Sequence, residues 1–254
     1  MSEEETNEEA PSFQTQRQIF EVEGKAPERD VQGPLAQLLY NRVVVFHRIS
    51  ESENLPGLIG TFLVAGLLLT AFFGGCLGMF AGGLQIFSSA VKVPLLLYGA
   101  GAVCLPALFT FNVLLGSRLS FGQTVAVLVM ATFLLAAVLA SLAPIVLFFV
   151  ISTTSKSFVI LLCVVCLSVA GVFGVLLLWK AMGYLTVRAG QFYDSKIIKT
   201  WTLIYAFVGT QLSWLLRPFV GDPGEFAFIR NVGGNFYTGL ARIVMELFTG
   251  GSGG

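Results

Sequence analysis

The stretch from residue 91 to residue 151 constrains the fold most, because it holds two long apolar segments separated by a short polar turn. Neither segment, 93–115 or 123–151, contains Asp, Glu, Lys, Arg or His. A helix that crosses a bilayer needs about 20 apolar residues, and both segments are long enough. The sequence therefore predicts a helical hairpin within a membrane.

The composition extends this prediction to the whole chain. Of the 254 residues, 55% are hydrophobic and 12% are charged, whereas soluble domains carry about 25% charged residues. Further apolar segments occupy residues 58–80, 158–179 and 201–216, the last being the shortest. We expect an all-α membrane protein in which a bundle of about five transmembrane helices fills residues 58–217, with amphipathic helices at the N- and C-terminal sides. The 15 basic and 15 acidic residues balance, so a nucleic-acid partner is not expected.

The region before the first apolar segment divides into two parts. Residues 1–32 are acidic and poor in large apolar residues, which is typical of a flexible tail; a short docking segment at 18–22 is the alternative. Residues 33–49 predict an amphipathic helix, with apolar residues at three- and four-residue steps. We expect this helix to lie on the membrane surface, where Arg42 and Arg48 contact lipid head groups. Packing against a partner subunit is the alternative.

The region after the fifth apolar segment, residues 218–249, begins with a turn rich in proline and glycine and ends in a second amphipathic helix. Residues 250–254 resemble a linker remnant and carry no weight in the fold prediction. Lys and Arg are more numerous on the side of the N-terminus, which predicts a cytoplasmic N-terminus and an external C-terminus. If the fifth segment does not cross the membrane, the C-terminus lies inside.

Two kinds of residue are expected to shape the bundle. Gly74, Gly78 and Gly82 recur every four residues, so one face of the first span would let another helix approach closely. Pro106 and Pro144 lie inside the second and third spans, where a proline removes a backbone hydrogen bond and kinks the helix.

The candidate polar residues are few. Asn112, Gln211 and Arg217 are predicted to line a polar seam, and helix-to-helix hydrogen bonding is the alternative. Arg118, in the turn between the second and third spans, is a further candidate contact for a lipid head group, and a solvated turn that caps both helices is the alternative. The expected spans contain no ionisable residue, which disfavours proton-coupled carriers, pumps and intramembrane proteases. No catalytic residue, cofactor site or metal site is predicted.

Cys163 and Cys166 have the spacing of a redox or metal-binding pair. They fall in the middle of the fourth apolar segment, where a thiolate would be poorly solvated. We interpret them as two small apolar residues one helical turn apart, and the redox or metal pair is the alternative.

Several short motifs resemble those of the Yip family, the membrane proteins that interact with Rab GTPases. Asp30-Val-Gln-Gly-Pro34 is similar to that family's Asp-Leu-Tyr-Gly-Pro motif, with two positions changed and a longer distance to the first span. A closer likeness is to Yip-related bacterial inner-membrane proteins of unassigned function. It is carried by Lys92-Val-Pro-Leu-Leu96, Leu105-Pro106, Phe111-Asn112, Gly209-Thr-Gln211 and Arg217-Pro-Phe219. The resemblance covers about residues 82–224 and implies no known active site.

These features together favour a non-enzymatic scaffold or accessory subunit of a membrane complex. Residues 1–49 would recruit another protein subunit, and membrane lipids would surround the spans. A subunit that transports lipid or solute through proline-kinked spans is the alternative. We expect the bacterial inner membrane as the location, with the ER or Golgi membrane as the alternative.

Overall fold

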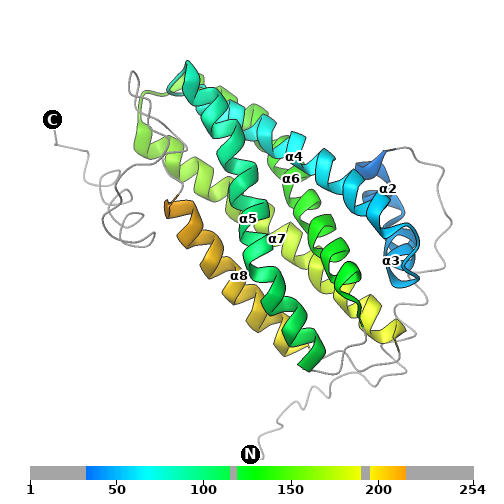
Figure 1. Cartoon of the computed structure of the whole chain (residues 1–254). Helices are drawn as coiled ribbons and strands as arrows, with labels where there is room; N and C mark the ends of the chain where they lie inside the picture. Colours follow the sequence, from blue (N-terminus) through cyan, green and yellow to red (C-terminus); the bar gives the residue numbers. More distant parts are fainter. Residues whose placement is uncertain (1–32, 115–118, 190–194, 216–254) are drawn as a thin grey trace, which may run out of the picture.

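The computed structural model describes residues 33–114, 119–189 and 195–215, and all regular structure in these ranges is helical. Two short helices, α2 (Pro34–Tyr40) and α3 (Arg42–Ser50), precede a bundle of long helices. The bundle contains α4 (Leu55–Gly78), α5 (Leu84–Leu114), α6 (Phe121–Ser152), α7 (Lys156–Arg188) and α8 (Ser195–Leu215). Successive bundle helices run in opposite directions (Figure 1).

Within the described ranges, four helices are long and apolar enough to cross a membrane: α4, α5 up to Thr110, α6 and α7. The predicted bundle of membrane-spanning helices is therefore confirmed in its class, with four candidate spans in place of five. The fifth predicted segment lies in α8, which is more amphipathic than the other four and packs alongside α5 (Figure 1).

In place of the single helix predicted over residues 33–49 the structure has two helices, because the helical conformation is interrupted at Asn41. Asn41 has φ −122° and ψ +35°, outside the helical region. Both helices lie at the end of the bundle where α4 and α6 begin and α7 ends, which we call the α3 end (Figure 1). The opposite end, where α4 turns into α5, is called the hairpin end. The predicted C-terminal amphipathic helix lies outside the described residues.

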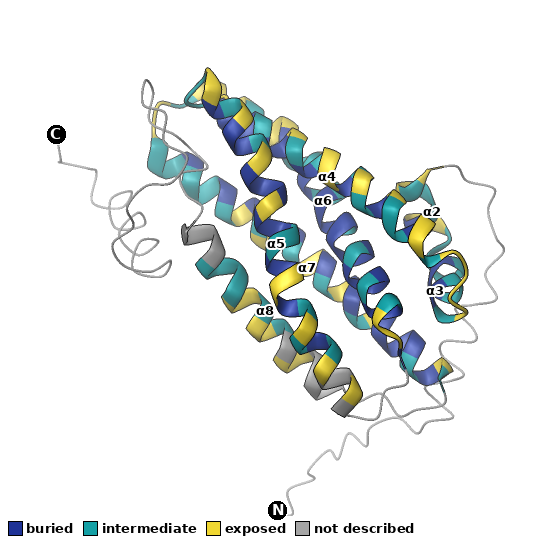
Figure 2. Ribbon diagram, in the orientation of Figure 1, coloured by how far each residue is buried: buried dark blue, intermediate teal, exposed yellow. Residues whose placement is uncertain are grey.

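The buried side chains form two clusters along the bundle (Figure 2). The cluster at the α3 end includes Phe62 of α4 and Phe133 of α6, whose rings lie 5.1 Å apart. The cluster towards the hairpin end joins α4, α5, α6 and α7. Many large apolar side chains on the outer faces of the helices are exposed, as expected where lipid replaces water.

Two glycines of α4, Gly74 and Gly78, let the backbone of α5 approach closely. A Cβ atom on Gly78 would lie 2.6 Å from Cα of Ile86, and one on Gly74 would overlap the carbonyl oxygen of Ser89. Gly82 does not take part, because it follows α4 in a turn with φ +72° and no atom would lie within 4 Å of its Cβ. Two of the three glycines predicted to pack thus lie at the contact, and the third serves the turn.

Substituting these glycines tests the contact. We expect Gly74→Ala and Gly78→Ala each to lower the free energy of unfolding by about 1–3 kcal/mol, because the backbone of α5 must move away. Gly75→Ala is the matched control, since its Cβ would meet only Ile86 Cγ2 at 4.0 Å. It should leave stability unchanged or raise it by up to about 1 kcal/mol through helix propensity. Unfolding by SDS in mixed micelles measures all three; equal effects at positions 74, 75 and 78 would contradict the close approach.

Candidate functional site

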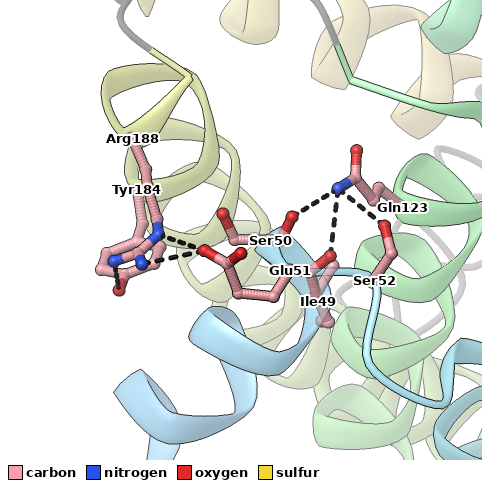
Figure 3. Close-up of polar contacts among 7 residues, drawn as sticks. All are labelled: Ile49, Ser50, Glu51, Ser52, Gln123, Tyr184 and Arg188. Carbon is pink, nitrogen blue, oxygen red and sulfur yellow. Dashed lines mark hydrogen bonds and ion pairs between the residues drawn. The ribbon is translucent and has the colours of Figure 1, made fainter.

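The side chain of Gln123 joins α3 to the bundle (Figure 3). Its Nε2 donates hydrogen bonds to the carbonyl oxygens of Ile49 at 3.1 Å and Ser50 at 2.8 Å, and to Ser52 Oγ at 3.3 Å. These acceptors belong to the last turn of α3 and the residues after it, where carbonyl groups have no partner within the helix. Gln123 therefore supplies a C-terminal cap from another helix.

The local sequence holds Gln123 in place. Ser120 and Gln123 form a capping box at the start of α6: Gln123 N donates to Ser120 Oγ at 3.2 Å, and Ser120 N donates to Gln123 Oε1 at 2.8 Å. The carboxamide oxygen is thereby fixed within its own chain segment, and the amide nitrogen is directed to α3. Gln123 is buried, and its bond to the carbonyl oxygen of Ile49 is the one most shielded from water.

Two further contacts hold α3 against the end of α7, and Figure 3 shows the first of them, an ion pair. Arg188 donates from Nε and Nη2 to Glu51 Oε1, at 3.1 and 2.9 Å. Both side chains are about half exposed, so this ion pair contributes little free energy. The ring of Phe46 lies 5.8 Å from that of Tyr184, and Ile49 and Val45 are buried beside them. The apolar face of α3 is thus covered by the protein's own bundle.

A buried polar strip lies along α5 at the hairpin end. Lys92 has no exposed surface, and the other buried polar side chains on the same helix face are Gln85, Ser88 and Ser89. Their spacing of three, four and seven residues places them on one face, which meets the glycine face of α4. The sequence placed Lys92 just outside the second span, but α5 begins at Leu84 and includes it. The expectation of spans without ionisable residues is therefore wrong at this position.

The predicted polar seam is not brought together. Asn112 lies near the end of α5, whereas Gln211 lies near the end of α8. Because the two helices run antiparallel, these residues belong to opposite ends of the bundle (Figure 1). Arg217 lies outside the described residues.

The remaining predicted residues are scattered. Arg42 and Arg48 are half-buried residues at the two ends of α3, and Arg118 lies outside the described residues. Pro106 and Pro144 are inside α5 and α6, as predicted, and both are exposed on the outer surface of the bundle. The structure therefore gives neither proline a place in a shared internal path.

Cys163 and Cys166 are buried in the cluster towards the hairpin end and are not joined by a disulfide. In the described ranges, no group of three or more His, Cys, Asp or Glu side chains is arranged to hold a metal ion.

Comparisons with known proteins found no matching family model, curated protein or solved structure. The resemblance to the Yip family accordingly stays a prediction.

Sequence reasoning missed the two most informative side chains. Gln123 was placed only as the first residue of a span, although Ser120-Phe-Gly-Gln123 has a capping-box signal of the kind that marks a helix start. Lys92 carried a signal too, because Gln85, Ser88 and Ser89 precede it at helical spacing. Neither signal reveals which helix lies opposite, which only the folded chain supplies.

Replacing Gln123 tests the connection between α3 and the bundle. We expect Gln123→Leu to lower the local stability of α3 by about 1–3 kcal/mol, because the Ser50 carbonyl loses its donor and the Ile49 carbonyl keeps only the N–H of Ser52. Hydrogen exchange of the amides in α3 measures this loss directly. Ser141→Ala is the matched control on α6, since Ser141 is exposed and donates only to Val138 of its own helix. Unchanged exchange in α3 of the Gln123 variant would show that apolar packing alone holds this helix.

Proposed function

We propose that the chain is a non-enzymatic integral membrane scaffold, or accessory subunit, whose acidic N-terminal tail recruits another protein. The observation that carries this proposal is the fixed position of α3, which Gln123 ties to the bundle through buried hydrogen bonds. The tail, residues 1–32, joins the described chain at Gly33, immediately before α2. A tail attached to a fixed point presents a partner to the membrane at a defined place, which is what a scaffold requires.

The distribution of basic residues supports a cytoplasmic α3 end. Arg42, Arg48 and Arg188 lie there, and Lys199 near the start of α8 adds a fourth cation, whereas Lys156 lies at the hairpin end. Excess Lys and Arg next to spans favours the cytoplasmic side. The acidic tail then lies in the cytoplasm of, we propose, a bacterial cell; the ER or Golgi membrane is the alternative.

The packing of α8 supports its role as a fifth span. Trp179 Nε1 donates to Thr202 Oγ1 at 2.9 Å, and Lys199 Nζ lies 5.9 Å from the centre of the Trp179 ring. Tyr205 and Val208 pack against the core cluster at the α3 end. These contacts attach α8 to the bundle, where it packs against α5 and α7. A fifth crossing by α8 would place the C-terminus outside.

Removing the tail tests the scaffold proposal. We expect the full chain, extracted from its own membrane in mild detergent, to carry a stoichiometric companion in native mass spectrometry. Deletion of residues 1–32 should remove that companion, while α2, α3 and the spans remain. A variant with the tail residues in scrambled order is the matched control, because it keeps length and charge but not a binding motif.

A companion that survives the deletion, or its absence from the full chain, would contradict the proposal. If the companion is lost from the deletion variant but kept by the scrambled variant, the partner recognises the charge of the tail and not a defined motif.

One observation favours a second function, the transport of an anionic solute. Lys92 is buried within a candidate span, and ionisable residues inside membranes commonly mark transport paths. Its helix face also presents the hydroxyl of Ser88, which has no hydrogen-bond partner among the described residues. A cation beside hydroxyl and amide groups suits an anion.

Chloride efflux from proteoliposomes tests this second function. If the chain conducts anions, efflux should exceed that of empty vesicles, and Lys92→Met should reduce it at least tenfold because the positive charge is lost. Lys156→Met is the matched control at the same end of the bundle. Efflux at the level of empty vesicles for the unmodified chain would exclude chloride conduction.

A further inference from the structure

The outer side of α2 exposes large apolar side chains. Leu35, Leu39 and Tyr40 are 40%, 57% and 59% exposed, whereas Leu38 on the inner side is 2% exposed and belongs to the core cluster at the α3 end. Figure 2 shows this division between the exposed and buried sides of α2. The helix is therefore attached to the bundle by one side and leaves the other side uncovered.

The position of α2 places that side at the edge of the membrane. The helix contacts α4 and α6 (Figure 1), and Leu38 shares its cluster with Leu58 in the first turn of α4. A helix of 24 residues such as α4 is about 36 Å long, longer than the hydrocarbon core of about 30 Å. Its first turns therefore reach the head-group layer, and α2 lies beside them.

The helix α4, which α2 contacts, also carries exposed apolar residues. Further along α4, Val64 and Leu68 are 58% and 67% exposed, as residues in contact with lipid tails are. No acidic residue occurs from Gly33 to Ser50, and Arg42 lies two residues after the end of α2. Apolar residues with an adjacent cation and a tyrosine are typical of segments in the interfacial layer.

We propose that α2 is an interfacial anchor whose residues Leu35, Leu39 and Tyr40 insert into the head-group and acyl boundary of the leaflet at the α3 end. Lipid is the occupant because three side chains on a helix of seven residues are far fewer than the 20–30 residues per partner of a stable protein interface. Insertion fixes the depth of Gly33, the residue at which the tail joins the described chain.

Lipid quenching of a fluorescent label tests this anchor in the full chain. The four native cysteines are buried, so bimane can be attached to Leu35→Cys or Leu39→Cys. Glu53→Cys, exposed in the turn between α3 and α4, is the matched control at the same end. Each variant is placed, one protein per disc, in phosphatidylcholine–phosphatidylglycerol nanodiscs with or without a doxyl-labelled lipid.

We expect the doxyl lipid to quench the labels at positions 35 and 39 at least twofold, and aqueous iodide to quench them weakly. The label at position 53 should show the reverse. Stronger quenching by iodide than by doxyl lipid at positions 35 and 39 would overturn the proposal in favour of a water-exposed helix. Weak quenching by both agents would overturn it in favour of a surface covered by protein.

Discussion

Hydrocarbon offers no hydrogen-bond partner to a peptide group, and this constraint shapes the whole bundle. Each spanning segment must satisfy its backbone within one helix, so the helices cannot be held together by backbone pairing. Lipid tails are as apolar as leucine side chains, and close packing takes the place of the hydrophobic effect between helices. The contact of α4 and α5 at Gly74 and Gly78 meets this requirement, because backbone atoms approach where side chains are absent.

The connection at the α3 end obeys different rules. The ion pair of Glu51 and Arg188 is about half exposed, so water and salt reduce its contribution. Gln123 is buried, and its amide group reaches the carbonyl groups of Ile49 and Ser50. Without this donor the carbonyl of Ser50 would lose its partner and that of Ile49 would keep only the N–H of Ser52. The loss of a donor at a largely buried site costs more than the loss of a surface ion pair. One neutral side chain thus contributes more to the position of α3 than the charged pair does.

The class of the fold could be predicted from the sequence because runs of apolar residues leave few alternatives. The glycine spacing also predicted a packed face on the first span, and Gly74 and Gly78 lie on it. The prediction failed where it depended on boundaries and on the direction of neighbouring helices. Lys92 lies one residue before the expected span 93–115, but the helix that contains this span begins at Leu84 and includes Lys92. Asn112 was grouped with Gln211, although the antiparallel helices α5 and α8 place these residues at opposite ends of the bundle.

The placement of the N-terminal helices could not be predicted for a related reason. An amphipathic pattern indicates that one face of a helix is covered, but not whether lipid, a partner or the same chain covers it. The sequence of residues 33–49 predicts contact with lipid or a partner, whereas the inner faces of α2 and α3 are covered by the chain's own bundle. The interruption at Asn41 separates α2 from α3. The separate helix α2 buries Leu38 against the bundle and exposes Leu35, Leu39 and Tyr40 on its other side.

The geometry of the hairpin end bears on the choice between scaffold and transporter. A path for a solute beside Lys92 would require α5 to move relative to α4, since Lys92 has no exposed surface. That movement would have to break the backbone contacts of Gly74 and Gly78, which leave no layer of side chains to slide over. Packed contacts of this kind tend to switch between discrete arrangements and do not deform gradually. The structure describes one such arrangement, in which Lys92 is fully buried at the hairpin end and Gln123 holds α3 at the other end.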